Sequence, residues 1–170
     1  EIAMRLVEAN VITAYQADRT TQPRPPSAAS MKISIVIPSF NQAAFLPQAV
    51  ESVLSQQGDF DRRAIVVDGG SDDGSVNYLR SLNDPRLTWT SQPDRGQADA
   101  LNRGLAQVDG DVVGWLNSDD FYLPGALAAG AAAMRQNPEY HWLVGRYRII
   151  DEHGRVVSQR HRTIVAEEHG

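Results

Sequence analysis

From Met31 onward, short apolar runs alternate with segments in which apolar residues recur every three or four positions. The runs are rich in β-branched residues and predict strands buried on both faces, at 33–37, 64–68, 87–91 and 112–116. The segments with the helical period predict helices at 46–54, 75–82 and 96–106. Because strands and helices alternate, we expect parallel pairing through right-handed crossovers. The predicted fold class is therefore α/β, with a doubly wound, mostly parallel sheet and helices on both faces.

The last third of the chain departs from this alternation. An alanine-rich segment after Pro124 predicts a helix that runs to about Gln136. The turn-forming residues at 152–154 predict a C-terminal β-hairpin between 142–150 and 155–158. The tryptophans lie in or beside predicted strands, and we expect them to pack in the core, at positions 89, 115 and 142.

The first thirty residues follow a different pattern. Residues 1–18 have a loosely helical spacing of apolar residues, whereas 20–30 (TTQPRPPSAAS) cannot continue a helix. We therefore expect 1–30 to be an N-terminal helix and a Pro/Ser-rich linker, either the tail of another domain or an appended sequence. The expected α/β domain covers 31–170 and ends abruptly, which predicts that it is truncated.

Composition and charge mainly exclude certain classes of protein and of binding partner. With 42% hydrophobic and 22% charged residues, a chain of 170 residues suits one compact domain. The absence of Cys excludes disulfides, thiolate nucleophiles and zinc–thiolate sites, and it favours a cytoplasmic location. A net charge of −5 argues against a nucleic-acid partner. No apolar stretch is long enough for a transmembrane segment.

Polar residues follow three of the predicted strands at the point where each ends. These strand-end loops are Pro38-Ser39-Phe40-Asn41, Asp68-Gly69-Gly70-Ser71-Asp72-Asp73 and Asn117-Ser118-Asp119-Asp120. The carboxyl ends of parallel strands share one edge of the sheet, and ligands bind in the crevice at that edge. We therefore expect the three loops to converge on a binding site.

Two adjacent carboxylates in the last loop point to a cation. Asp119 and Asp120 would repel each other unless a hard divalent ion lay beside them. Oxygen ligands favour Mg²⁺ or Mn²⁺, which complete their coordination with water and substrate phosphates. The alternative is that one of these side chains caps the helix that follows Pro124.

Two further segments offer polar groups to a ligand. In the loop after the second strand, Asp68 can accept hydrogen bonds from a base or ribose, and Gly70 permits close backbone approach, although a simple polar turn would have the same residues. At the start of the helix 96–106, Arg95 can face a phosphate or remain in solvent, and Gln97 and Asn102 also remain available.

Taken together, four segments resemble the nucleotide-sugar-binding half of family 2 glycosyltransferases, which have the GT-A fold. They are SIVIPSFNQAAFLPQAVESVLSQ (34–56), IVVDGGSDDGS (65–75), SQPDRGQADALNRGLAQVDGDVVGWLNSDD (91–120) and FYLPGAL (121–127). The resemblance extends from Met31 to about Ser158, and the motifs have the order and spacing of the family.

The resemblance implies roles for the strand-end residues. Asp68 would hydrogen-bond the base, and Asn117-Ser118-Asp119-Asp120 would stand at the DxD position of the family. Asp119 would contact ribose and, with Asp120, hold Mn²⁺ or Mg²⁺. The full set implied to bind the nucleotide sugar is Pro38, Ser39, Phe40, Asn41, Asp68, Gly70, Arg95, Gln97, Asn102, Asn117, Ser118 and Asp119.

The sequence departs from the commonest family pattern at two positions. Gly69 stands where a second Asp is frequent, and Asn117 stands in place of the first Asp of the DxDD pattern. Because Asn117 brings no negative charge, we expect a lower affinity for the metal.

The reaction implied by the resemblance is transfer of a sugar from a nucleoside diphosphate to an acceptor hydroxyl, with inversion. A UDP-linked donor is favoured, and the acceptor would be a saccharide or a lipid-linked molecule, reached from the cytoplasm or from the inner face of the membrane. The general base is expected beyond Gly170, so we assign this role to neither Asp151 nor Glu152. One alternative is a donor-binding fragment without catalysis of its own. Another is a nucleotidyltransferase, which PSFNQAAFLPQ (38–48) disfavours because it has no glycine and no basic residue.

Overall fold

The computed structural model describes residues 5–7, 30–151, 153–160 and 164–166. Its helices are α1 (Leu46–Leu54), α2 (Ser75–Ser81), α3 (Gln97–Leu105) and α4 (Ala126–Gln136). Its strands are β1 (Arg5–Val7), β2 (Met31–Ser39), β3 (Phe60–Asp68), β4 (Leu87–Ser91), β5 (Val112–Trp115), β6 (Trp142–Val144), β7 (Tyr147–Ile150), β8 (Val156–Arg160) and β9 (Ile164–Ala166).

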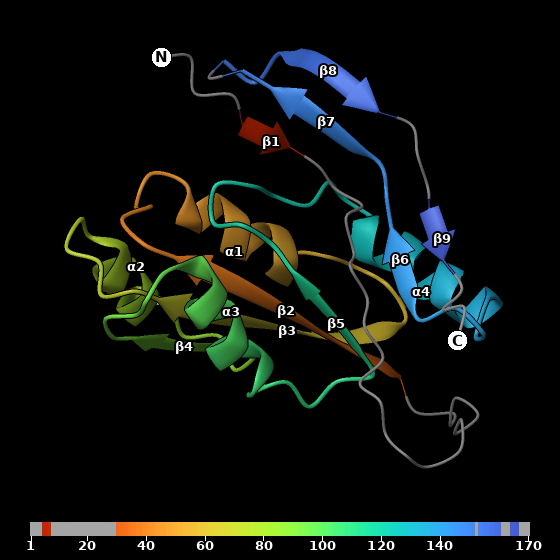
Figure 1. The fold of residues 1–170 in the computed structure, drawn as a ribbon, viewed down its shortest axis with the longest axis horizontal. Helices are drawn as coiled ribbons and strands as arrows, with labels where there is room; N and C mark the ends of the chain where they lie inside the picture. The colour runs from red at the N-terminus through yellow and green to blue at the C-terminus, as the bar shows by residue number, and fades with distance from the viewer. Residues whose placement is uncertain (1–4, 8–29, 152, 161–163, 167–170) are drawn as a thin grey trace.

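The centre of the molecule is a parallel sheet with the strand order β4-β3-β2-β5 (Figure 1). β2 pairs with β3 over its whole length, from Met31 opposite Phe60 to Ser39 opposite Asp68. On its other side β2 pairs with β5. The chain thus builds outward through β3 and β4 and then crosses back to β5, so the strand order reverses at β2. The predicted doubly wound, parallel α/β sheet is confirmed, and its switch point lies at the carboxyl end of β2.

Helices cover both faces of this sheet, as predicted. Alternate residues of β2 point to opposite faces. Ile33, Ile35 and Ile37 belong to the larger core cluster, together with buried residues of α1 and α4. Val36 lies in a smaller cluster on the other face, where Ala100 of α3 packs. The fully buried β-branched residues of β2 therefore separate two apolar layers.

α3 approaches β2 closely because residue 104 is a glycine. A Cβ at Gly104 would lie 2.3 Å from Cγ1 of Val36 and 3.3 Å from Cγ2 of Val67. The absence of a side chain at this position lets the helix backbone rest directly on β2 and β3. This contact sets the distance between α3, which begins at Gln97, and the carboxyl edge of the sheet.

The C-terminal strands form small antiparallel sheets beside the parallel one (Figure 1). The predicted hairpin is confirmed as β7 and β8. Its turn is organised by the Asp151 carboxylate, which accepts the backbone N–H groups of His153 at 3.0 Å and Arg155 at 2.9 Å. The hydrogen bond from the Arg155 backbone, together with that from its guanidinium, lowers the pKa of Asp151. The stretch predicted as one strand at 142–150 is divided at 145–146, because β6 pairs with β9 instead.

Two other predictions are wrong. Residues 5–7, expected in a helix, form β1, whose backbone pairs antiparallel with β7 (Arg148–Ile150), so tertiary pairing overrides the helical spacing there. The remainder of the predicted helix at 1–18 lies outside the described residues. Trp115, expected in the core, is 43% exposed because β5 is an edge strand of the parallel sheet and α3 packs against β2 and β3. Trp89, in contrast, packs against the larger core cluster as predicted.

In the part of the chain that the structure describes, no helix has the length and apolar character needed to cross a bilayer.

Replacing Gly104 by Ala tests the close helix–sheet contact. Helix propensity alone favours Ala over Gly by about 1 kcal/mol. The added methyl group would collide with Val36, however, so we expect a loss of about 1–3 kcal/mol in the free energy of unfolding. Urea denaturation measures this loss. Leu105→Ala, at a neighbouring position that is 46% exposed, is the control and should change little. A Gly104→Ala variant more stable than the wild type would show that the contact is not tight.

Candidate functional site

The first two strand-end loops are joined directly by hydrogen bonds. The N–H of Gly69 donates to the Ser39 carbonyl oxygen at 2.8 Å. Asn41 has a left-handed backbone with φ of 52°, its N–H donates to Ser71 Oγ at 2.8 Å, and its Oδ1 accepts the N–H of Asp72 at 3.1 Å. Asn tolerates this conformation better than most residues. The chain therefore turns sharply after β2 and is held against the loop that follows β3.

The carboxylate of Asp68 organises the loop after β3. Asp68 is fully buried. Its Oδ2 accepts the N–H groups of Gly70 at 3.1 Å and Ser71 at 2.9 Å and the hydroxyl of Ser91 at 2.7 Å, while its Oδ1 accepts the Ser71 hydroxyl at 2.5 Å. Three of these donors share Oδ2 and one reaches Oδ1, so protein groups hold both oxygens of a carboxylate that has no exposed surface. The structure therefore gives Asp68 a structural role in place of the base contact that the resemblance implies.

The segment before α3 packs onto the same loop. Gln92 donates its N–H to the Asp68 carbonyl oxygen at 3.0 Å. Gly70 has φ of +88°, and a Cβ there would lie 3.2 Å from the backbone nitrogen of Pro93. A glycine is needed at position 70 both for the backbone conformation and for this approach. The residues around Asp94 are thereby placed beside the carboxyl end of β3.

A chain of side-chain hydrogen bonds links α3 to the loop after β5. Gln97 Nε2 donates to Asn117 Oδ1 at 2.7 Å, and Asn117 Nδ2 donates to Asp120 Oδ2 at 3.0 Å. The N–H of Asp120 also donates to the Asn117 carbonyl oxygen at 3.0 Å. Asn117 thus fits between the helix and Asp120, where an Asp would lack the N–H donor that this carboxylate receives.

Asp119 and Asp120 differ in their surroundings. Asp120 is only 8% exposed and is held by Asn117. Asp119 is half-buried, and its carboxylate has no hydrogen-bond or ion-pair partner among the described residues. No cluster of three or more His, Cys, Asp or Glu side chains able to hold a metal occurs within the described ranges. Two carboxylates therefore fit a Mg²⁺ or Mn²⁺ ion that takes its remaining ligands from water and a diphosphate, and they do not fit an ion enclosed by protein alone.

Two buried polar residues, Ser52 in α1 and Gln56 just after it, hold the loop that contains these carboxylates, and sequence reasoning missed both. Ser52 Oγ accepts the N–H of Tyr122 at 3.0 Å. Gln56 is 2% exposed; its Nε2 donates to the Leu123 carbonyl oxygen at 2.9 Å, and its Oε1 accepts the N–H of Leu127 at 3.2 Å. α4 has no N-terminal side-chain cap of its own, so Gln56 supplies an acceptor for its first turn. The signal in the sequence was a polar residue at 52 on the apolar face of the predicted helix 46–54; residue 56 lies beyond that helix and gave no such signal.

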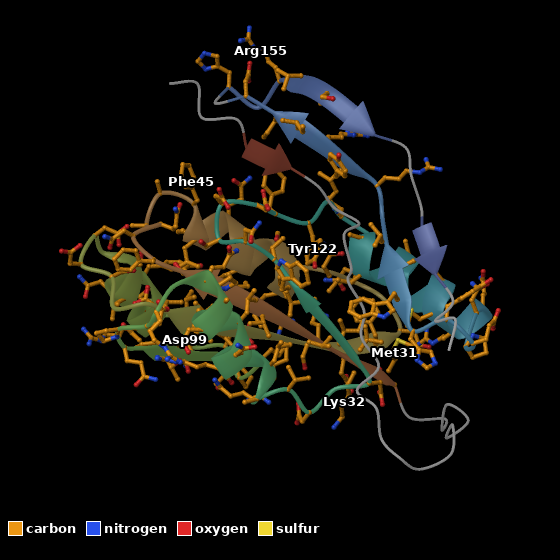
Figure 2. All side chains as sticks on the ribbon, viewed as in Figure 1. Met31, Lys32, Phe45, Asp99, Tyr122 and Arg155 are labelled. Carbon is orange, nitrogen blue, oxygen red and sulfur yellow. The ribbon has the colours of Figure 1, made fainter. Side chains whose placement is uncertain are left out.

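Tyr122 lies inside the molecule near α1 and β5 (Figure 2). It is 3% exposed and belongs to the larger core cluster. Burial, together with the negative charge of Asp120, raises the pKa of the Tyr122 hydroxyl. Tyr122 therefore remains protonated at neutral pH.

The remaining predicted site residues differ in how exposed they are. Pro38 is buried in β2, and Ser39 and Ser118 are buried at the strand ends. The Phe40 ring is 59% exposed. Asn102 is exposed on α3, about 140° around the helix from Gln97, and the structure does not bring it together with the other site residues.

Arg95 lies just before α3 and points largely into solvent. Its side chain is 88% exposed, and its guanidinium is 3.6 Å from the Asp99 carboxylate. The backbone N–H of Arg95 and the positive charges of Arg103 and Arg95 lower the pKa of Asp99, which lies on α3 (Figure 2). Asp99 therefore stays ionised at neutral pH and orients both arginines, of which Arg95 is the more accessible.

A doubly wound α/β sheet with polar loops and carboxylates at its carboxyl edge is typical of domains that bind their ligand at that edge. Residues 34–169 match the family model described as Glycosyl transferase family 2. The chain belongs to this family, as the sequence motifs predict.

Comparisons with individual proteins agree with this assignment. An uncharacterized glycosyltransferase of Mycobacterium tuberculosis is 37% identical over 103 residues, which are 60% of this chain and 39% of the relative. The chain thus spans less than half the length of that relative.

Solved structures show the same GT-A fold. Staphylococcus aureus TarS, in complex with UDP-GlcNAc, matches with a TM-score of 0.58 and 24% identity over 64% of this chain and 32% of TarS. The mannosyltransferase PcManGT of Pyrobaculum calidifontis, in complex with GDP-Man and Mn²⁺, matches with a TM-score of 0.57 and 23% identity over 71% of this chain and 36% of PcManGT.

Asp68→Asn tests whether the Asp68 carboxylate is structural. The substitution would place an amide donor against the N–H and O–H groups that Asp68 now accepts. We expect the free energy of unfolding to fall by about 2–3 kcal/mol, measured by chemical denaturation. Asp72→Asn, in the same loop but exposed, is the matched control and should leave stability nearly unchanged. Equal stability of the two variants would argue that the Asp68 oxygens are free for a ligand.

Gln56→Leu tests the anchoring of the loop after β5. Leu keeps most of the volume but leaves the Leu123 carbonyl and the Leu127 N–H without a partner. We expect a loss of about 2–3 kcal/mol in the free energy of unfolding. The control is Gln57→Leu, because Gln57 is exposed and bonds only the nearby Ser55 carbonyl oxygen. A loss of the same size in both variants would count against an anchoring role for Gln56.

Proposed function

We propose that this chain is the donor-binding part of a glycosyltransferase that moves a sugar from a nucleoside-diphosphate-sugar to an acceptor hydroxyl, with inversion and with the help of a divalent metal. The observation that carries the proposal is the difference in hydrogen bonding between the two carboxylates after β5. Asp120 is held in place by Asn117, whereas Asp119, at the edge where ligands bind, has no partner among the residues that the structure describes.

The proposed donor site follows from the order of the loops along this edge. Ser39, Phe40 and Asn41 at the end of β2 would line the nucleoside pocket, because β2 lies at the switch point. Asn117, Ser118 and Asp119 would face the ribose and the diphosphate. Gln97, hydrogen-bonded to Asn117, would fix that loop from the side of α3.

Charge explains why a metal and an arginine would be needed. The chain has a net charge of −5, and a nucleoside diphosphate is itself an anion. Asp119 and Asp120 would hold Mg²⁺ or Mn²⁺, which supplies positive charge to the diphosphate that leaves. Arg95, beside the N-terminus of α3, is 88% exposed and its ion pair with Asp99 is long, at 3.6 Å, so its guanidinium would turn toward the same phosphates.

The ligands of two structural neighbours support this choice of substrate class. TarS is seen with UDP-GlcNAc, and PcManGT is seen with GDP-Man and Mn²⁺. Both ligands are nucleotide sugars, which supports a donor of this class. Their bases differ, so the titration below includes both UDP and GDP.

The proposed reaction is a single displacement at the anomeric carbon. The acceptor oxygen forms a bond to that carbon as the bond to the diphosphate oxygen breaks, and the proton of the acceptor hydroxyl passes to a general base. Asp151 does not fit the role of this base, because its carboxylate accepts hydrogen bonds from His153 and Arg155 within the hairpin turn. We therefore place the base outside the donor site described here, on the acceptor side.

The second candidate function is donor binding without transfer. It is favoured by the engagement of Asp151 in a turn. Both candidates require the same donor site. They differ in whether sugar transfer accompanies binding.

A thermal-shift titration with UDP, GDP and dTDP, each with and without Mn²⁺, tests the donor site. At a ligand concentration about 100-fold above Kd, we expect one or more of these nucleotides to raise Tm by about 5–10 °C in the presence of Mn²⁺. In Asp119→Asn the Mn²⁺-dependent part of the shift should disappear, because the side chain loses its charge.

Asp61→Asn is the matched control for this titration, since Asp61 is an exposed carboxylate in β3. It should behave as the wild type. No shift with any nucleotide, or a Mn²⁺-dependent shift that survives in Asp119→Asn, would contradict the proposed site.

A further inference from the structure

The space where a side chain of residue 69 would lie is already filled. A Cβ at Gly69 would be 2.9 Å from Asp94 Oδ2 and 3.2 Å from Phe40 Cδ2. Asp94 comes from the segment between β4 and α3, and Phe40 follows β2. Two side chains from separate loops therefore meet over the bare backbone of Gly69, at the carboxyl edge of the sheet.

One oxygen of the Asp94 carboxylate is available. Oδ1 accepts the N–H of Gly96 at 2.8 Å, which fixes the orientation of the carboxylate. Oδ2 has no hydrogen-bond or ion-pair partner within the residues that the structure describes. The nearby guanidinium groups of Arg95 and Arg103 are engaged with Asp99 instead. Asp94 is half-buried, so its second oxygen can accept a hydrogen bond from a ligand without breaking one within the described residues.

The neighbouring Phe40 offers an apolar surface to the same ligand. The ring is 59% exposed, although it lies directly after a buried strand. An aromatic ring presented in this way binds the face of a planar heterocycle. A ligand that fits both groups is therefore flat and aromatic and carries an N–H on its edge.

We propose that Asp94 selects the nucleoside base of the donor, with Oδ2 accepting a ring N–H of a base that lies against Phe40. This inference rests on the proposed function, because it assumes a nucleoside-diphosphate-sugar at this edge. Gly69 contributes by leaving the space that the Asp94 carboxylate occupies. The Asp94 carboxylate would thus lie where a side chain of residue 69 would otherwise be.

The proposal predicts which bases are accepted. Uracil and thymine carry N3–H, and guanine carries N1–H, so each can donate a ring hydrogen to Oδ2. Cytosine N3 and adenine N1 carry a lone pair at the corresponding position, which would face a negatively charged oxygen. Uridine, thymidine and guanosine diphosphates should therefore be bound in preference to cytidine and adenosine diphosphates.

The test is isothermal titration calorimetry of the 170-residue chain with UDP, dTDP, GDP, CDP and ADP, all in Mn²⁺. In the wild type, at least one of UDP, dTDP and GDP should bind about ten-fold or more tightly than CDP and ADP. In Asp94→Asn, the side-chain oxygen stays on the Gly96 N–H, so the amide NH₂ takes the place of Oδ2. Affinity for the preferred nucleotide should fall about ten-fold, and affinity for CDP should be maintained or rise.

Two further variants separate base selection from folding and from general binding. Phe40→Ala removes the stacking surface and should weaken all five nucleotides by a similar factor, about ten-fold, without changing their order. Asp72→Asn, an exposed carboxylate in the loop after β3, should leave affinities and order unchanged. The thermal unfolding of Asp94→Asn in the absence of ligand should match that of the wild type.

The outcomes that overturn the proposal are distinct from failure of the donor site itself. Equal binding of all five nucleotides by the wild type, or an equal loss of all five in Asp94→Asn, would exclude Asp94 as the selecting residue while the donor site stands. If the wild type binds none of the five in Mn²⁺, the proposed function fails, and the role of Asp94 fails with it.

Discussion

The arrangement of the strand-end loops depends on one buried charge, the carboxylate of Asp68. Burying a carboxylate is costly unless hydrogen bonds replace the lost water. Here the donors come from Gly70 and Ser71 in its own loop and from Ser91 at the end of β4. Ser71 also accepts the N–H of Asn41, so the network reaches the turn after β2. A single buried side chain thereby fixes the relative positions of three strand ends.

The fixed groups and the available groups at this edge are different residues. Asp68 and Asn41 are hydrogen-bonded within the protein, whereas Asp119 and the second oxygen of Asp94 have no partner in the described part of the chain, and the Phe40 ring is exposed. Side chains that are held by protein donors cannot be displaced by a ligand without loss of stability, whereas unsatisfied groups gain a partner when the ligand arrives. A pre-organised binding site needs both kinds of group: side chains that hold the loops rigid and side chains that are open to a ligand.

Much of the fold follows from local patterns, and much of the site does not. The β-branched runs predicted the four parallel strands, and the helical spacing predicted α1 and α3, because these patterns reflect burial on known faces. Exposure of Trp115 depended on β5 lying at the edge, and the pairing of residues 5–7 depended on a strand about 140 residues away. The roles of Asp68 and Gln56 depended on which donors surround them in three dimensions. The sequence motifs placed Asp68 at the site but could not show whether its carboxylate supports the loop or contacts a ligand, and they did not indicate Gln56 at all.

Under the proposed function, metal binding and donor binding would be mutually dependent. Asp119 and Asp120 offer an ion two carboxylates, and no larger cluster of metal-binding side chains occurs in the described part of the chain. Mg²⁺ and Mn²⁺ prefer more oxygen ligands than that, so a bound ion must recruit the others from water or from a diphosphate. In a chain with a net charge of −5, a bound ion would offset the negative charge of the diphosphate, and the diphosphate would complete the coordination of the ion. Because binding free energies are reciprocal, each ligand must raise the affinity for the other by the same factor. Asn117 brings no negative charge, so under the proposed function it would leave the ion more dependent on the diphosphate than an acidic side chain at this position would.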